Sequence, residues 1–353
     1  MSFDSYQQIP TAEPLVEVRR GSITESRHRG HLAVVEPDGT VVASLGTPAT
    51  VSYLRSSAKP FQAIPLLVSG AADRYGLDDR EVALACASHS GEPIHTEIVA
   101  GMLRKIDLTS DALRCGVHEP YSVSAAQELR DRGESPTELH NNCSGKHAGM
   151  LAVAKHIGTS IGTYDQPENP VQLMIGRVMS QFSGVPLDVL AVGVDGCGVP
   201  VFGMTVEAMA LAYARLISPP GEFDAVTQVA CRRIVSVMTH YPELIGGTAD
   251  RLDTEIMKAA PGRLVSKVGA EGVYTSGILP CERWPRGLGL AFKIEDGDDH
   301  RARPTVTIEA LRQLGILHDG SLETVSRYAF FPIKNRRQEV VGEVRAFFRL
   351  NSK

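Results

Sequence analysis

Strand-like segments stand at both ends of this 353-residue chain, and helix-like segments fill most of the middle. Asp38-Gly39 is typical of a hairpin turn between two of the strands, and residues 340–348 alternate as a half-buried strand does. This order favours an α+β fold: a mixed sheet shared by the N- and C-terminal strands, packed by helices, with a largely helical insertion. The expected strands are residues 15–18, 31–36, 40–45, 264–268, 272–278, 288–294 and 340–348.

The middle of the chain is expected to form a mostly helical lobe over about residues 57–260. In its first helix Pro60 falls in the opening turn and is tolerated, whereas Pro65 lies deeper and should kink or shorten the helix. No flexible linker or repeat is visible, so residues 1–353 are expected to form one unit. The expected helices are residues 57–68, 81–86, 92–106, 146–156, 170–182, 206–216, 223–238 and 306–314, with a buried strand at 189–194 and loops at 115–143 and 296–302.

Charge and composition exclude several kinds of partner. A net charge of -5 gives no reason to expect nucleic acid or an anionic membrane. No apolar run approaches the about 18 residues that a membrane helix needs.

Residues 1–14 lack the basic start and apolar stretch of a signal peptide, so we expect a cytoplasmic protein. In that compartment the six cysteines, which include no CxxC pair, should be reduced.

The first segment that carries chemistry is Arg55-Ser56-Ser57-Ala58-Lys59. Ser56 and Lys59 lie one turn apart on one face of the expected helix. A serine is a poor nucleophile until a neighbour takes its proton, and a lysine can do so when burial or a second cation lowers its pKa. About one S-x-x-K is expected by chance, so a capping serine beside a surface lysine explains this motif alone equally well.

Two further segments place polar residues where helices begin. Ser88, His89 and Ser90 form a hydroxyl-rich turn that can face a cleft, although Ser90 also suits a helix cap. In Asn142-Cys143-Ser144-Gly145-Lys146-His147, Cys143 and Lys146 face the same way. A helix cap with a buried thiol is the alternative for this segment.

Two later segments end strands. In Asp195-Gly196-Cys197-Gly198 an acid follows an apolar run, which places a carboxylate at a pocket mouth or simply forms a tight turn. If Cys197 meets Cys143, then a zinc site, a disulfide and coincidence all stay open. In Lys267-Val268-Gly269-Ala270-Glu271-Gly272 the lysine either points into a site beside the strand edge or lies on the surface before a hairpin turn.

In this order and spacing the five segments resemble the serine-dependent L-asparaginases first associated with rhizobia, the asparaginase II family. The resemblance runs from about Leu15 to the C-terminus. It implies a fold like the serine β-lactamases and serine-dependent glutaminases, with the active site at the sheet edge. The residues that carry it are Ser56-Ser57-Ala58-Lys59-Pro60, Ala87-Ser88-His89-Ser90, Asn142-Cys143-Ser144-Gly145-Lys146-His147, Asp195-Gly196-Cys197-Gly198 and Lys267-Val268-Gly269-Ala270-Glu271-Gly272.

The resemblance also implies roles for individual residues. The chain would hydrolyse the side-chain amide of L-asparagine through a seryl acyl-enzyme, and two Ser-Lys pairs would form one coupled proton network. Ser56 would attack with Lys59 as its general base, while Ser88 and Lys267 would relay protons. The substrate would be bound by Arg55, Asp195, Gly196 and His147, and zinc, which the chemistry does not require, by Cys143, Lys146 and Cys197. A homodimer without an organic cofactor is implied as well.

Three alternatives stay open on sequence alone. Glutamine differs from asparagine by one methylene, which a pocket distinguishes by only ~1–3 kcal/mol. A β-lactamase-like serine hydrolase shares S-x-x-K and a K-T-G strand, but here the strand has Lys267-Val268-Gly269 and no S-D-N is present. A non-catalytic zinc or redox protein would use Cys143 and Cys197 alone.

Overall fold

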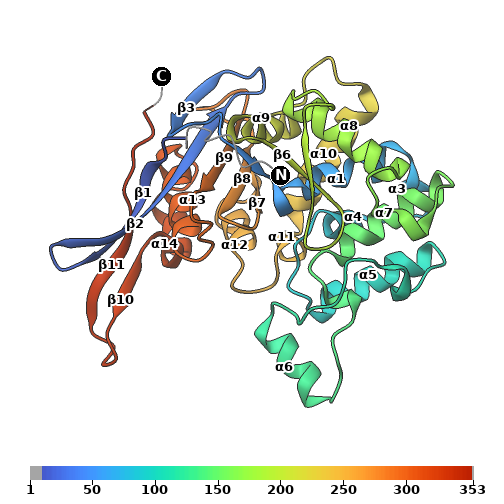
Figure 1. Ribbon diagram of the computed structural model, residues 1–353, viewed down its shortest axis with the longest axis horizontal. Coiled ribbons are helices and arrows are strands. Elements are labelled where there is room, and N and C mark those ends of the chain that lie inside the picture. Colours follow the sequence, from blue (N-terminus) through green and yellow to red (C-terminus); the bar gives the residue numbers. More distant parts are fainter. Residues whose placement is uncertain (1–9, 352–353) are drawn as a thin grey trace, which may run out of the picture.

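The N- and C-terminal strands lie side by side in one antiparallel sheet, in which Val18 of β1 pairs with Val344 of β11. The computed structural model describes residues 10–351. The strand order is β10-β11-β1-β2-β9-β8-β7, and β3 pairs with β2 (Figure 1). The strands are β1 (Glu13–Arg20), β2 (Ile23–Val35), β3 (Val41–Leu45), β7 (Leu264–Val268), β8 (Val273–Ile278), β9 (Leu288–Ile294), β10 (Phe331–Lys334) and β11 (Val340–Ala346).

The α+β class is thereby confirmed, with three differences in the sheet, of which the first is that β10 was not expected. Every strand pair within residues 10–351 is antiparallel, so the sheet is not the mixed one that we expected. In addition, β2 begins at Ile23 rather than near residue 31. The missed part is mostly exposed and polar, so no alternation of apolar residues marks it in the sequence.

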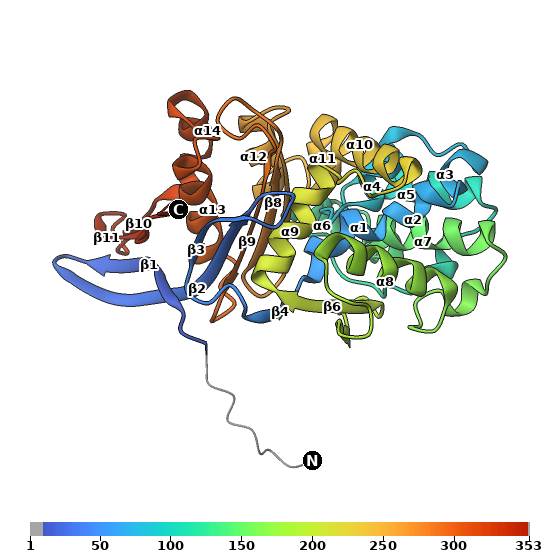
Figure 2. The same ribbon diagram turned by 90° about the horizontal axis from the view of Figure 1, so that it is seen from above.

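Helices cover both faces of this sheet. Figure 2 shows α9 (Val206–Ile217) on the face toward the helical lobe, and α13 (Ala302–Gln313) and α14 (Asp319–Ala329) on the other face. The backbone of α9 lies almost directly on β9, because a Cβ atom added at Gly289 would come within 1.8 Å of the Ala210 carbonyl oxygen. Position 289 therefore requires glycine, because no side chain fits between β9 and α9 at this contact.

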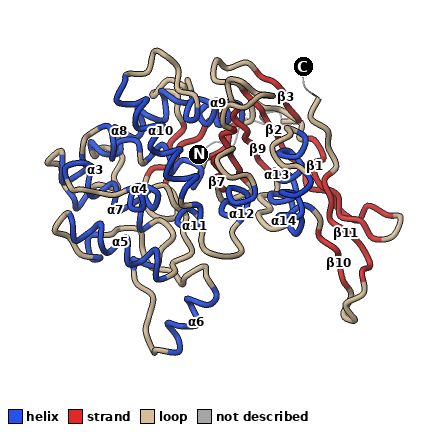
Figure 3. The backbone as a smooth tube through the Cα atoms, turned by 180° about the vertical axis from the view of Figure 1, so that it is seen from behind, coloured by secondary structure: helices blue, strands red, loops and turns tan. Residues whose placement is uncertain are grey.

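The helical lobe lies beside the sheet, as the view from behind in Figure 3 shows. It also contains a small sheet of order β4-β6-β5. Its elements are the 3-10 helix η1 (Arg55–Ala58), α1 (Lys59–Gln62), α2 (Ile64–Val68), α3 (Ala71–Arg74), α4 (Asp79–Ala85), α5 (Pro93–Lys105), α6 (Val123–Asp131), α7 (Ser144–His156), α8 (Pro170–Ser183), α10 (Ala225–His240), α11 (Pro242–Ile245), α12 (Leu252–Ala259), β4 (Val51–Tyr53), β5 (Ala191–Val194) and β6 (Pro200–Thr205).

Local chemistry explains where several of these helices start and stop. Pro65 has no N–H, and the expected helix over residues 57–68 is divided at Ala63, as predicted. Asp78 and Glu81 form a reciprocal capping box at the start of α4. No helix of residues 10–351 combines the length and hydropathy of a membrane span.

Three expectations for the lobe and its surroundings are wrong. The strand expected to be buried at 189–194 is β5, an edge strand with Val194 75% exposed. The expected loop at 115–143 contains α6, which Ser122 caps. The helix expected at 306–314 begins earlier, at Ala302, because Asp298 accepts hydrogen bonds from the N–H groups of Arg301 and Ala302, and α14 after it was not expected.

Candidate active site

Ser56 sits at the start of a short helix that is fixed to the sheet. The Ser57 hydroxyl donates to the Lys267 carbonyl at 3.0 Å, and the Tyr213 hydroxyl donates to the Ser57 carbonyl at 2.7 Å. Directly before Ser56, Arg55 has a left-handed backbone with φ 52°, which non-glycine residues seldom adopt. The second serine of the S-S-A-K motif is therefore structural, and it joins η1 to the end of β7.

The buried Lys59 amine contacts the second serine of the predicted set. Its Nζ donates to Ser88 Oγ at 2.8 Å and to the Asn142 carbonyl at 3.2 Å. Ser56 Oγ has no hydrogen bond within the described chain. The hydroxyl beside the Lys59 amine is thus that of Ser88 and not, as we expected, that of Ser56.

Lys267 lies at the end of β7, and its partner is an acid that we did not predict. Its Nζ is 3.4 Å from Asp253 Oδ2 and 3.2 Å from the Val268 carbonyl. Asp253 also accepts hydrogen bonds from Ser266 Oγ and from the Val268 N–H. The expected Ser88–Lys267 contact is therefore replaced by an ion pair between Lys267 and Asp253.

Both lysines are held below their ordinary pKa. Burial is the main cause of the lowered pKa of Lys59, and the Lys146 ammonium lowers it further. Burial also lowers the pKa of Lys267 to about 8, because the attraction of Asp253 only partly offsets burial and the nearby charges of Lys59 and Arg251. An amine that loses its proton near neutral pH is suited to general-base work.

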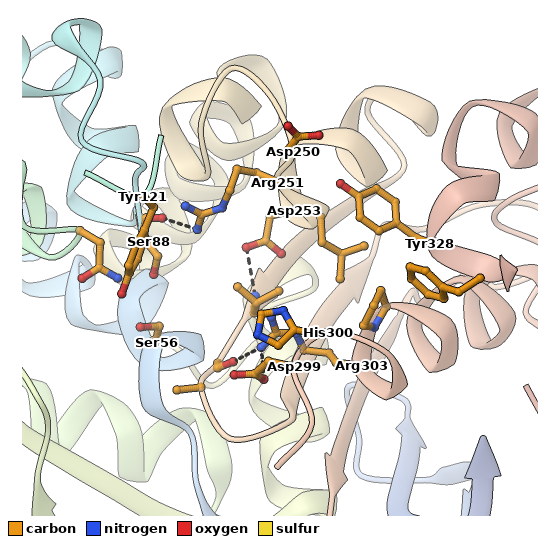
Figure 4. A pocket seen from close by; sticks show the side chains of 17 residues that line it. Ser56, Ser88, Tyr121, Asp250, Arg251, Asp253, Asp299, His300, Arg303 and Tyr328 are labelled. Atoms are coloured by element: carbon orange, nitrogen blue, oxygen red, sulfur yellow. Dashed lines mark hydrogen bonds and ion pairs between the residues drawn. The ribbon is translucent and has the colours of Figure 1, made fainter. Parts of the chain in front are cut away.

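A cavity of ≈ 490 Å³ opens at the two serines. Figure 4 shows Ser56 and Ser88 at one end, Tyr328 at the other, and Arg251 and Asp253 between them. Lys59 and Lys267 are not part of the lining and lie buried in the wall. The lining residues are Ser56, Ser88, Tyr121, Asn142, Asp250, Arg251, Leu252, Asp253, Val268, Gly269, Ala270, Asp299, His300, Arg303, Pro304, Tyr328 and Phe331.

The three residues expected to hold zinc do come together. Lys146 Nζ donates to Cys197 Sγ at 3.0 Å, and the buried Cys143 thiol lies close enough to both to interact with them electrostatically. The Cys197 side chain, together with the Lys146 and Lys59 charges, holds the pKa of Cys143 well below its usual range despite burial. The two sulfurs in turn raise the pKa of Lys146 overall, although burial acts against them. The cluster therefore places the Lys146 amine beside two buried sulfurs.

The expected substrate-binding residues lie outside the cavity lining. Arg55 Nε donates to Asp195 Oδ1 at 2.9 Å, and the Gly196 N–H donates to the same oxygen at 2.8 Å. The charges of Lys146 and Arg55 and the Gly196 N–H lower the pKa of Asp195, although its burial acts to raise it. His147 is fully buried and bonds through Nδ1 to the Tyr164 hydroxyl at 2.7 Å, while its Nε2 has no partner in the described chain.

Several charged residues of the cavity were missed from the sequence. Arg251 and Asp253 stand at the start of α12, a helix that we did not expect. Asp299 and His300 belong to a segment taken for a solvated loop, and Arg303 lies in the first turn of α13. A run of acids and arginines looks the same in a sequence whether it faces solvent or a cleft, so only the fold separates the two cases.

One protein family matches nearly the whole chain. The model of one family, described as L-asparaginase II, matches residues 16–346. The chain is therefore an enzyme of the amidohydrolase class. It belongs to the L-asparaginase II family. The homodimer that the resemblance implies and the cytoplasmic location expected from residues 1–14 stay predictions.

Solved structures give a looser likeness. A probable glutaminase from Bacillus subtilis complexed with 6-diazo-5-oxo-L-norleucine is 12% identical, with 82% of this chain and 86% of that chain covered and a TM-score of 0.39. A β-lactamase from Mycobacterium bovis is 16% identical, with 81% and 94% covered and a TM-score of 0.42. At such scores the likeness supports no conclusion about activity. No curated protein sequence matches the chain.

Proposed function

We propose that the enzyme is an L-asparaginase that releases ammonia from the side chain of L-asparagine through a seryl ester. The observation that supports this most is the contact between Lys59 Nζ and Ser88 Oγ, at the end of the cavity where Ser56 also opens. A buried amine, a hydroxyl bonded to it and a second, unbonded hydroxyl are the groups that acyl transfer needs.

In the first step Ser56 Oγ attacks the amide carbon of the substrate. Its proton passes by way of the Ser88 hydroxyl to the neutral Lys59 amine, which is hydrogen-bonded to Ser88 and whose burial favours the uncharged form. A negative charge then develops on the amide oxygen. Ser56 and Ala270 both line the cavity, and their backbone N–H groups donate no hydrogen bond within the described chain, so we assign these two N–H groups to the oxyanion.

In the second step the carbon–nitrogen bond breaks and the leaving nitrogen takes a proton. Ser88 gives its hydroxyl proton to that nitrogen and takes one back from the Lys59 ammonium along their 2.8 Å hydrogen bond. Water then attacks the ester, again with Lys59 as base, and aspartate leaves. Lys267 acts on this network through charge, because its own contact is with Asp253.

The amino-acid end of the substrate is assigned to Asp195 and Arg55. The two side chains already form an ion pair at 2.9 Å. A zwitterion can exchange with such a pair, its α-ammonium binding Asp195 and its α-carboxylate binding Arg55. Gly196 and His147 would complete this pocket, since the Gly196 N–H orients the Asp195 carboxylate.

Zinc is proposed as a bound metal beside this site. Two sulfurs and one amine converge at Cys143, Cys197 and Lys146, and the thiolate character of Cys143 suits a soft metal. Within residues 10–351 no group of three or more His, Cys, Asp and Glu side chains could hold a metal, so Lys146 would have to serve as the third ligand and a fourth position would stay open. Bound zinc would supply positive charge next to the proton network.

An assay of ammonia release tests the proposal directly. It compares reactions with asparagine, with glutamine and without either amino acid. The wild-type enzyme should act on asparagine, and trapping of the acyl-enzyme followed by mass spectrometry should place the added mass on Ser56. The Ser57→Ala variant is the matched control, because Ser57 is the neighbouring serine and is buried away from the cavity. A label on Ser88, or no ammonia from asparagine, would contradict the assignment.

A further inference from the structure

The cavity at Ser88 is larger than the release of ammonia requires. Its ≈ 490 Å³ lies within the range of about 300–1,000 Å³ in which proteins bind drug-sized ligands. From Ser56 and Ser88 it continues past Arg251 to Tyr328 (Figure 4). The cavity therefore has room for a substrate that extends beyond the scissile nitrogen.

The extra room lies on the leaving-group side if the proposed mechanism holds. In that mechanism Ser88 gives its proton to the leaving nitrogen, so the nitrogen must sit beside Ser88. The residues assigned to the amino-acid end, Asp195 and Arg55, do not line this cavity. A substituent on the nitrogen would thus enter the cavity, whereas the aspartyl part would point away from it.

The charges along the cavity leave one cation without a counter-ion. Each of its three carboxylates has a cationic partner within the described chain: Arg327 for Asp250, Lys267 for Asp253 and Arg303 for Asp299. Within the same residues Arg251 has no carboxylate within ion-pair distance.

The guanidinium of Arg251 is held in place and still has donors to spare. Nη2 donates to the Ser88 carbonyl at 2.6 Å and Nη1 donates to Ser90 Oγ at 2.9 Å. The Tyr121 ring lies 5.7 Å from the guanidinium carbon. Arginine carries five N–H donors in a planar fork that matches a carboxylate. Two of these donors are used here. The immobilised guanidinium of Arg251 therefore has unused N–H donors and no counter-ion within the described chain, and it lies next to Ser88, which would protonate the leaving group.

We propose that the enzyme also hydrolyses β-aspartyl peptides, in which the side-chain nitrogen of asparagine carries a second amino acid, and that Arg251 binds the carboxylate of that amino acid. This activity rests on the proposed function, because it uses the same nucleophile and the same proton network. Ser56 Oγ bonds to the β-carbonyl carbon, and the bond from that carbon to the nitrogen breaks. The nitrogen takes the proton from Ser88. Water then splits the ester, so that one water is consumed and aspartate and a free amino acid are formed.

The test compares two substrates that differ only in the carboxylate: β-aspartyl-alanine and β-aspartyl-alaninamide. With the wild-type enzyme the first should have a kcat/KM roughly 10- to 100-fold higher, the usual worth of a charge-assisted hydrogen-bonded pair. In Arg251→Gln this ratio should fall close to unity, mainly through KM, while ammonia release from asparagine persists. Any general damage from the substitution cancels in the ratio.

Two further variants keep the result interpretable. Arg251→Lys retains the charge without the planar fork and should give an intermediate ratio. Arg312→Gln removes a half-exposed arginine that pairs with Glu309 outside the cavity lining and should leave the ratio unchanged. Asparagine turnover without hydrolysis of β-aspartyl-alanine would overturn the inference, and so would a ratio that survives in Arg251→Gln.

Failure of the proposed function is recognised separately. If the wild-type enzyme releases no ammonia from asparagine, the asparaginase proposal falls, and calorimetric binding of the same two dipeptides then decides the role of Arg251. Tighter binding of β-aspartyl-alanine than of its amide, lost in Arg251→Gln, would support carboxylate binding at Arg251. Equal binding would overturn it.

Discussion

Lys267 and Asp253 form a fully buried ion pair, with side chains 0% and 1% exposed and Nζ and Oδ2 3.4 Å apart. The pair stands at the end of β7, where η1 and the sheet are joined through Ser57. Asp253 is the group that keeps the pKa of Lys267 from falling further, since burial and the charges of Lys59 and Arg251 all lower it. The protonation of Lys267 therefore depends on Asp253, a carboxylate in the cavity wall.

Activity should rise with pH through about 8. The pKa of Lys267 is about 8 in the folded enzyme, against an ordinary value of 10.5. Below that pH Lys267 is an ammonium and opposes proton uptake by the neighbouring Lys59, whereas above it this repulsion is removed. The pH dependence of kcat/KM for asparagine measures this directly. A profile that is flat or falls between pH 6 and 9 would count against the lysine network.

Asp253→Asn should move that rise to lower pH by about one unit or more, because an opposite charge within a few ångströms shifts a pKa by about 1–3 units. It should also lower the free energy of unfolding, by up to about 3–5 kcal/mol, since Lys267 is left buried without a counter-ion. Asp250→Asn is the control. Its carboxylate is exposed and pairs with Arg327, so it should change neither quantity. Equal pH profiles for wild type and Asp253→Asn would disprove the coupling.

Ser56→Ala and Lys59→Ala should each lower kcat by at least about 10³-fold, as loss of a nucleophile or its base does. Thermal unfolding monitored by circular dichroism should show that Ser56→Ala folds normally. Ser57→Ala should lower stability by only about 1 kcal/mol, because the Lys267 carbonyl keeps a second donor in Thr275 Oγ1. Turnover retained by Ser56→Ala would remove this serine from the mechanism.

Zinc should bind in proportion to the protein and should be lost when the sulfurs are removed. Metal analysis after gel filtration is expected to find zinc in the wild type and little in Cys143→Ala or Cys197→Ala. Cys231→Ala is the matched control, since this cysteine is also buried but lies in α10 away from Lys146. Equal zinc in all four proteins would exclude the cluster as the site.

Gly289→Ala should destabilise the fold by about 1–3 kcal/mol or more, the usual effect of overpacking. The added methyl would meet the Ala210 carbonyl of α9 at 1.8 Å. Gly320→Ala serves as the opposite case, because nothing lies within 4 Å of its position in α14, and alanine there should stabilise the helix by about 0.5–1 kcal/mol. Chemical denaturation of both variants measures the difference. A stable Gly289→Ala would contradict the close approach of α9 to β9.

The sequence allowed most strands of the sheet and most of the longer helices to be predicted, because their apolar patterns are regular, but it did not reveal β10 or α14. It also allowed Ser56, Lys59, Ser88 and Lys267 to be chosen as a group. It did not allow their contacts to be predicted, because the i, i+3 spacing of Ser56 and Lys59 leaves the lysine side chain free to reach Ser88 instead. Asp253 could not be found either, since a single acid in a short helix carries no pattern until the helix packs beside β7.

The pairing of β1 with β11 has a consequence for the order of synthesis. β11 lies inside the sheet, between β10 and β1, yet it is translated after the other strands of the sheet. Until residues 340–346 leave the ribosome, β1 has an open edge that invites pairing with other chains. The helical lobe, by contrast, is made well before β11. Nascent chains halted before residue 340 should therefore aggregate through β1, and a chaperone that covers that edge would raise the yield of folded enzyme.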